Sequence, residues 1–278
     1  MGKIFTLTTF CSALIAATCA YSQQPSVAFD AGAKYVALGS SFAAGNGVPA
    51  QLGSCGRSDH NYSNLVAAAL NLSITDVSCS GATTDNILHT PQREEAPQIQ
   101  AVTPDTKLVT VTIGGNDINY TTSTFACAGT SADEHCAANL DRAAIDQAVS
   151  QLPAKLAATF DAIRARAPQA AIVVVTYPRV FPIDAVACSE LELSAEDTTY
   201  LAELGQTLED AFVSVSADRQ LLIADAYVEA AGHGPCDPVA ERWVNGNSVA
   251  DTGIRYHPTA VGHREMARLV LAALGHSE

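Results

Sequence analysis

The chain has few basic residues. Its 278 residues include 15 Lys and Arg against 29 Asp and Glu, a formal net charge of −14 at pH 7. A surface with this excess of negative charge repels phosphate backbones and anionic lipid headgroups. Nucleic acids and anionic bilayers are therefore excluded as expected partners.

The chain also lacks internal repeats and has no Gly/Pro-rich linker that would divide it. Charged residues make up only 16% of the chain and hydrophobic residues 48%. This composition supplies one sizeable core, and the length suits one α/β domain. We therefore expect a single domain over residues 23–278 and a monomer as the default oligomeric state.

The N-terminus lacks a hydrophobic run long enough for a typical membrane span. Lys3 is followed by a short apolar stretch at 4–20 and then by polar residues at 22–24. A basic start, a short apolar stretch and small residues near its end are typical of a secretory signal peptide. We expect residues 1–22 to be removed and the protein to be secreted, without a stable membrane anchor. An uncleaved N-terminal anchor is the alternative.

Cysteine and histidine spacing excludes the common zinc motifs, because no Cys-x-x-Cys or His-x-x-x-His pair occurs. No metal and no other cofactor are expected. Of the eight cysteines, two fall in the expected signal peptide, and an even number in a secreted chain indicates disulfides. The count alone does not select a connectivity. We expect the sequential pairing, because it would staple three separate loops: Cys55–Cys79, Cys127–Cys136 and Cys188–Cys236.

Short apolar runs alternate with helical patterns along the chain. Five runs rich in Val, Ile and Leu are expected to be strands: 35–39, 73–78, 108–113, 171–176 and 221–225. Continuous apolar strands are typical of parallel sheets covered on both faces. The alternation predicts a doubly wound α/β domain with a mainly parallel five-stranded sheet.

Helix boundaries are marked at three places between these strands. Ser194 begins a Ser-x-x-Asp sequence like a capping box, and the last helix is expected to start near Thr259. Pro153 marks either a start or a kink of another helix. The segment at 117–140 is expected to be a long loop beside a site.

Four candidate functional residues stand after strand ends or just before the last helix. Ser41, Gly81 and Asn116 each follow one of the first three strands, and His257 precedes a proline. Ligands of open α/β sheets bind at the carboxyl ends of the strands. Each segment alone is also compatible with an ordinary turn. Together they supply a nucleophile, a general base and oxyanion donors.

These four positions resemble the signature of the SGNH hydrolases, also called the GDSL family of lipases and esterases. Three strings in the chain are similar to those of its secreted, disulfide-bonded branch, which includes the Streptomyces esterase: Cys-Ser-Gly-Ala-Thr at 79–83, Gly-Gly-Asn-Asp at 114–117 and His-Pro-Thr-Ala at 257–260. The resemblance runs from about residue 35 to 271. It implies the flavodoxin-like doubly wound sandwich of the SGNH hydrolase fold.

The resemblance also implies a mechanism. His257 takes the proton of Ser41, which attacks an ester carbonyl and forms an acyl-enzyme. The oxyanion is held by the backbone N–H groups of Ser41 and Gly81 and by the amide of Asn116. Expected substrates are lipid esters or small-molecule esters.

Two positions depart from the family pattern. The namesake Gly-Asp-Ser is Gly-Ser-Ser here, with Ser40 in the middle and Ser41 in register as the nucleophile. Three residues before His257, most of the family has an aspartate, whereas this chain has Ile254. The resembling branch uses a backbone carbonyl there, so the Ile254 carbonyl is expected to orient the imidazole. Asp251 is the side-chain alternative.

Three other functions remain compatible with the sequence, and one of them is phospholipase activity. The same fold hosts carbohydrate O-acetyl esterases, and a secreted binding protein can keep the fold without catalysis. The presence of all four signature residues favours an enzyme. The sequence therefore predicts a secreted serine carboxylic ester hydrolase.

Overall fold

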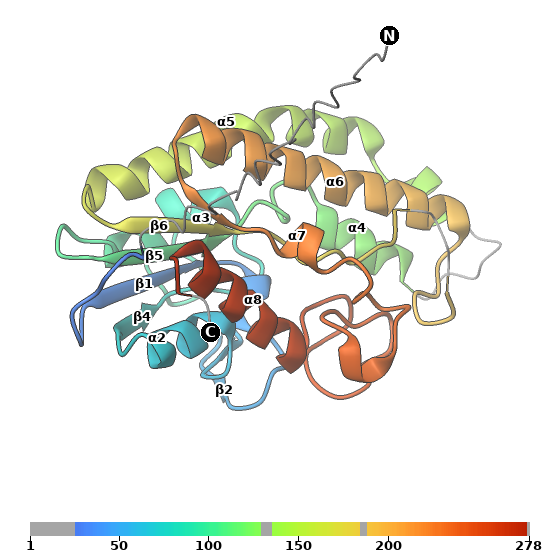
Figure 1. The fold of residues 1–278 in the computed structure, drawn as a ribbon. Coiled ribbons are helices and arrows are strands. Elements are labelled where there is room, and N and C mark those ends of the chain that lie inside the picture. The colour runs from blue at the N-terminus through green and yellow to red at the C-terminus, as the bar shows by residue number, and fades with distance from the viewer. Residues whose placement is uncertain (1–25, 129–134, 184–187, 277–278) are drawn as a thin grey trace, which may run out of the picture.

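The computed structural model describes residues 26–128, 135–183 and 188–276 (Figure 1). The predicted signal peptide, residues 1–22, lies outside the described residues. The central sheet has five parallel strands in the order β4 (Ser73–Asp76), β1 (Lys34–Gly39), β5 (Leu108–Thr112), β6 (Ala171–Val175) and β7 (Leu222–Ala224). This is the predicted flavodoxin-like order, with the topological switch point between β1 and β5.

The strands form where the apolar runs predicted them, within two residues at each end. The three central strands, β1, β5 and β6, are buried because helices cover both faces of the sheet, whereas the edge strand β4 is partly exposed. In β1, every residue from Tyr35 to Leu38 is 0% exposed, and β5 is buried throughout. A polar side chain on either face of these strands would lose its water, which explains the continuous apolar runs.

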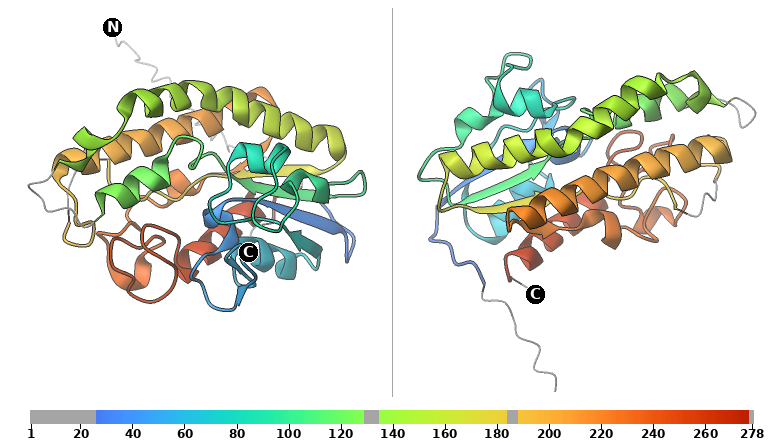
Figure 2. Two further views of the ribbon diagram at one scale, coloured as in Figure 1. Left: turned by 180° about the vertical axis from the view of Figure 1, so that it is seen from behind. Right: turned by 90° about the horizontal axis from the view of Figure 1, so that it is seen from above.

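Helices lie in two layers (Figures 1 and 2). One face of the sheet is covered by α2 (Tyr62–Ala69) and α8 (Ala260–Ala273), and the other by α3 (Thr84–Leu88), α5 (Arg142–Arg166) and α6 (Ala195–Asp218). The shorter elements are α1 (Ser41–Ala44), α4 (Tyr120–Cys127), α7 (Ala226–Glu229), the hairpin of β2 (Gln51–Leu52) and β3 (Arg57–Ser58), and the 3₁₀ turns Gln98–Ala101, Cys136–Asn139 and Val239–Glu241.

Two predicted helix starts are confirmed, and of the two alternatives given for Pro153 the helix start is wrong. The side chain of Ser194 caps α6 and that of Thr259 caps α8, each accepting a backbone N–H three residues later. Pro153 instead lies inside α5, which starts at Arg142 after the cap Asp141. Pro153 is exposed, so water can reach the carbonyl that its ring leaves without a partner.

The six cysteines that the structure describes form the sequential pairs Cys55–Cys79, Cys127–Cys136 and Cys188–Cys236, as expected. The segment predicted as a loop at 117–140 contains α4 and a 3₁₀ turn, which the second of these disulfides joins. Asp197 lies beside that disulfide and accepts the backbone N–H of Ala137 at 2.8 Å. The disulfide sulfurs are not free thiolates, so this cluster is structural.

No helix in the described ranges is long and apolar enough to cross a membrane.

Glu209 of α6 is a buried acid that makes stability depend on pH. It is 4% exposed, and burial, together with the charge of Asp225, raises the pKa of its carboxyl from 4.5 to about 8. Between these values the folded protein keeps a proton that the unfolded chain releases, so stability falls as pH rises. We expect Glu209→Gln to raise the free energy of unfolding at pH 8 by roughly 2–4 kcal/mol.

Urea denaturation at pH 8 and pH 4 checks this expectation. At pH 4 the wild-type carboxyl is protonated in both states for most of the population, so Glu209→Gln is expected to change little. The exposed Glu203 of the same helix gives the matched control, Glu203→Gln, with little effect at either pH. A stabilisation of equal size at both pH values would contradict the raised pKa.

Candidate active site

Ser41 and His257 meet at the carboxyl end of β1. Ser41 opens α1, and its Oγ lies 2.8 Å from Nε2 of His257, although 216 positions separate the two residues. Both side chains are buried, at 5% and 2% exposed. A serine hydroxyl bonded directly to an imidazole nitrogen is the arrangement that nucleophilic catalysis requires.

Gly39 lets the chain leave β1 and present Ser41. Its φ is +144°, and a Cβ there would lie 2.4 Å from the carbonyl oxygen of Thr112. The buried amide of Gln98 accepts the Gly39 N–H at 2.8 Å and donates to the Gly39 carbonyl at 2.9 Å. Nothing in the local sequence pattern points to Gln98, because its partner is 59 positions away.

The second ring nitrogen of His257 sets the tautomer. Nδ1 lies 2.8 Å from the carbonyl oxygen of Arg255, which can only accept. Nδ1 therefore carries the proton, and Nε2 is the acceptor that faces the Ser41 hydroxyl. In this tautomer the imidazole is ready to take the serine proton.

The orienting carbonyl is one residue away from the predicted one. The Ile254 carbonyl accepts the backbone N–H of His257 at 3.2 Å, which closes a turn. Tyr256 in that turn has a φ of +56°. The carbonyl of the preceding residue, Arg255, is the one that accepts the hydrogen bond from Nδ1 of His257. The predicted role of Ile254 is therefore wrong. Asp251, the side-chain alternative, is exposed and is not a hydrogen-bond partner of the ring among the described residues.

Aromatic rings enclose the imidazole. The ring centroids of Phe42 and Phe125 lie 4.6 Å and 5.9 Å from that of His257. Burial lowers the pKa of His257 to about 4, and the hydrogen bond to the Arg255 carbonyl opposes this shift only in part. The ring is therefore neutral at pH 7. The sequence carried no signal for the two phenylalanines, since neither belongs to a motif.

Gly81 and Asn116 reach the same edge of the sheet from the strands on either side of β1. Asn116 Nδ2 donates to the Ala82 carbonyl at 2.9 Å, which joins the two loops. A carboxamide has two N–H donors, and this bond uses one. Within the described parts of the chain, the Gly81 N–H makes no hydrogen bond. The two residues thus offer the donors expected of an oxyanion hole.

Asp117 joins the same loops through its carboxylate. Its carboxylate accepts the Thr84 N–H at 3.0 Å and the Thr84 hydroxyl at 2.6 Å, and Lys155 Nζ lies 3.7 Å away.

A groove of about 670 Å³ runs beside Asp117 between α3 and α5. Its lining includes Asn116 but not Ser41, Gly81 or His257, so the groove lies to one side of the Ser41–His257 pair.

The chain is similar to a known family and to solved structures. Residues 37–265 match the model of the GDSL-like Lipase/Acylhydrolase family. Lipase 2 of Streptomyces coelicolor is 31% identical over 253 residues, which cover 87% of this chain and 85% of that protein. The range that matches the family model, 37–265, includes both Ser41 and His257.

Two crystal structures of Streptomyces proteins have a similar fold. The extracellular lipase of Streptomyces rimosus is 30% identical with a TM-score of 0.73, and the match covers 86% of this chain and 99% of that chain. Phospholipase A1 of Streptomyces albidoflavus is 28% identical with a TM-score of 0.71, over 89% of this chain and all of that one. The similarity therefore extends over most of the described residues.

Proposed function

Because the chain belongs to the GDSL-like lipase/acylhydrolase family and is a carboxylic ester hydrolase, we propose that it cleaves lipid and small-molecule esters through an acyl-enzyme on Ser41. The observation that carries the proposal is the 2.8 Å hydrogen bond between Ser41 Oγ and His257 Nε2. A nucleophile in contact with its base is the first requirement of this chemistry.

The reaction takes place in two halves. As Ser41 Oγ attacks the ester carbonyl, its proton moves to Nε2 of His257, which then gives it to the departing alkoxide. Water enters in place of the alcohol and loses a proton to the same nitrogen as it attacks the acyl-enzyme. Nε2 then returns that proton to Ser41 Oγ as the carboxylic acid leaves. Throughout, Nδ1–H donates to the Arg255 carbonyl, so the ring keeps its orientation.

The orienting group is a neutral carbonyl instead of a carboxylate. The Arg255 carbonyl stabilises the imidazolium through its dipole alone, and that is weaker than a full negative charge. Much of the stabilisation of the transition state must therefore come from the groups that bind the developing oxyanion. In our proposal it is held by the backbone N–H groups of Ser41 and Gly81 and by the Asn116 amide.

The proposed enzyme is secreted and acts outside the cell. Three disulfides join the loops around the sheet, and disulfides persist in oxidising compartments. The similar lipase of Streptomyces rimosus is described as extracellular. The predicted signal peptide at residues 1–22 agrees with this localisation.

Hydrolysis of p-nitrophenyl esters from acetyl to palmitoyl tests the proposed function. We expect turnover across the series, and a p-nitrophenyl alkylphosphonate is expected to add one phosphonyl group to the peptide that contains Ser41. A rate confined to the acetyl ester would instead favour the carbohydrate O-acetyl esterase. Absence of turnover and of labelling in folded, oxidised protein would contradict ester hydrolysis.

The low pKa of His257 predicts activity in mild acid. The base must be neutral, so kcat/KM is expected to fall only as pH drops through about 4, the pKa of the buried ring. An exposed histidine would lose activity near pH 6.5. Rates on a neutral ester from pH 3.5 to 8 locate this limb, and a midpoint between 6 and 7 would show that burial does not depress the pKa.

A further inference from the structure

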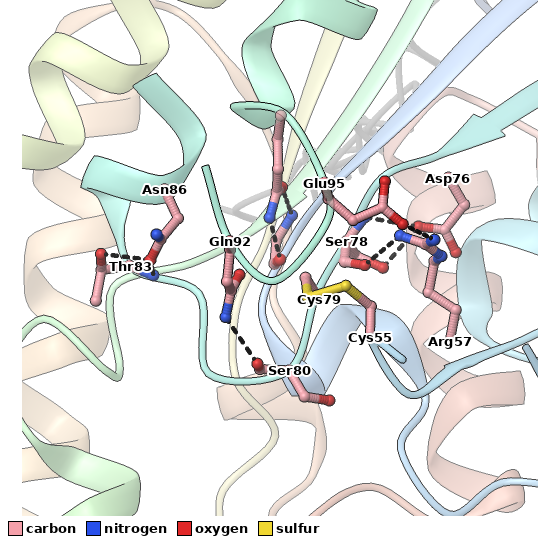
Figure 3. Close-up of a disulfide and its surroundings, with 12 residues drawn as sticks. Cys55, Arg57, Asp76, Ser78, Cys79, Ser80, Thr83, Asn86, Gln92 and Glu95 are labelled. Carbon is pink, nitrogen blue, oxygen red and sulfur yellow. Dashed lines mark hydrogen bonds and ion pairs between the residues drawn. A yellow bond between two sulfur atoms is a disulfide. The ribbon is translucent and has the colours of Figure 1, made fainter. Parts of the chain in front are cut away.

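Gln92 lies over the loop that follows β4 (Figure 3). Its Nε2 donates to the Ser80 carbonyl at 2.9 Å, and a Cβ built on Gly81 would lie 3.5 Å from the same nitrogen. The side chain therefore touches the backbone at the point where the candidate oxyanion donor begins.

The Ser80 carbonyl and the Gly81 N–H belong to the same peptide group. In a planar trans peptide these two groups point in opposite directions, and the described residues contain no cis bond. By holding the carbonyl on one side, Gln92 directs the Gly81 N–H to the other side. The hydrogen bond also polarises the peptide and so strengthens its N–H as a donor.

The turn by itself does not decide the direction of this peptide. The Ala82 N–H donates to the Cys79 carbonyl at 3.0 Å, and Gly81 has a φ of +84° at the third position, while Ser80 keeps a negative φ. This is a type II turn. Glycine at that position also accepts a type I turn, in which the middle peptide is reversed. The hydrogen bond from Gln92 to the Ser80 carbonyl is an outside contact that favours the observed orientation of the two.

The residues before this peptide are anchored without Gln92. Cys79 is bonded to Cys55, whose carbonyl accepts the Ser80 N–H at 2.9 Å. Arg57 Nη1 donates to the Ser78 carbonyl at 3.1 Å. Loss of the Gln92 side chain would therefore free the Ser80–Gly81 peptide while the loop stays in place.

Gln92 is itself held firmly. It exchanges two backbone hydrogen bonds with Glu95, of 3.0 Å and 2.9 Å, in a tight turn. Arg57 ties this turn to the loop through a 2.6 Å ion pair with Glu95, as Figure 3 shows. The donor of the Ser80 carbonyl thus has a fixed position.

We propose that Gln92 is a positioning residue for ester hydrolysis, which holds the Ser80–Gly81 peptide so that the Gly81 N–H faces the oxyanion. This inference rests on the proposed function. Nothing in the sequence pattern marks Gln92, because it lies outside the signature strings and acts through a backbone carbonyl.

The first test compares Gln92→Ala with Gln100→Ala, a glutamine exposed on a neighbouring 3₁₀ turn. For Gln92→Ala we expect kcat on p-nitrophenyl butyrate at pH 8 to fall by about 10- to 100-fold, less than the loss of a whole oxyanion donor. KM is expected to stay within about twofold because the ground-state carbonyl gains little from the hole. Gln100→Ala is expected to match the wild type.

A second variant, Gln92→Glu, separates positioning from packing. An ionised carboxylate keeps the shape of the amide but cannot donate to the Ser80 carbonyl, whereas the protonated acid can. We expect the deficit of Gln92→Glu to shrink as pH falls from 8 to 5, while that of Gln92→Ala stays constant. His257 remains neutral over this range, since its pKa is about 4. A packing defect would not respond to pH in this way.

Binding of a trifluoromethyl ketone, which forms an oxyanion on the serine, is expected to weaken in Gln92→Ala by the same factor as kcat. The inference is overturned if Gln92→Ala keeps the wild-type kcat or changes only KM. It is also overturned if the loss of kcat in Gln92→Glu does not depend on pH and is accompanied by a lower unfolding midpoint of that variant. A Ser41→Ala variant distinguishes the two levels. If Ser41→Ala keeps full activity, the proposed function is refuted. If Ser41→Ala is inactive but the Gln92 variants keep the wild-type kcat, only the role of Gln92 is refuted.

Discussion

Ser41→Ala is expected to lower kcat on p-nitrophenyl esters by roughly 10⁵- to 10⁶-fold, the size of loss typical when a catalytic serine is removed. In the proposed mechanism Oγ forms the covalent bond of the acyl-enzyme, and a water molecule in its place would lack both its fixed position and its contact with His257. Steady-state rates on folded variant and wild type measure the effect. Phosphonate labelling is expected to disappear as well.

Ser40 provides the matched control for this substitution. Its hydroxyl is buried and bonded to the Tyr177 hydroxyl at 3.0 Å, away from His257. Ser40→Ala loses one buried hydrogen bond, so we expect kcat within about tenfold of the wild type. An inactive Ser40→Ala beside an active Ser41→Ala would reverse the assignment of the nucleophile.

Asn116→Ala is expected to lower kcat by about 10²- to 10³-fold with a small change in KM, because the amide donates to charge that develops only in the transition state. Part of the loss comes from the Ala82 carbonyl, which loses its 2.9 Å hydrogen bond. Asn116→Asp keeps the size but removes the donors, and it is expected to be as slow as the alanine variant at pH 8.

Asn119 is the control for Asn116. It is exposed, and its φ of +58° suits glycine, so Asn119→Gly keeps the local backbone. We expect this variant to retain the wild-type kcat. If Asn116→Ala raised KM and left kcat unchanged, the amide would bind the substrate in its ground state and would not belong to the oxyanion hole.

The sheet was predictable because its signal is local. The central strands β1 and β6 are largely apolar runs bounded by turn residues, and burial on both faces favours such runs. The edge strand β4 (Ser73–Asp76) is partly exposed and has a single large apolar residue, Ile74. A local signal also marks the helix starts at Ser194 and Thr259, whose side chains cap backbone groups three residues away. The start of α5 was missed because Pro153, a strong local signal, is tolerated on an exposed helix face.

The orienting group of His257 shows where local signals end. The resemblance pointed to a backbone carbonyl near position 254, and the acceptor is the carbonyl of Arg255. A backbone oxygen is present at every residue, so residue type cannot identify the one that meets the ring. The positive φ of Tyr256 accompanies this arrangement, and it became visible only in the folded turn.

Residue type and order, together with the family resemblance, were enough to propose the reacting groups, because a hydroxyl, an imidazole and an amide have their chemistry wherever they stand. The distances, tautomer and pKa of these groups depend on contacts between residues far apart in the chain. Ser41 meets His257 across 216 positions, and Gln98 holds Gly39 across 59. Such contacts arise when parallel strands align their carboxyl ends, so tertiary structure alone brings these groups into reacting geometry.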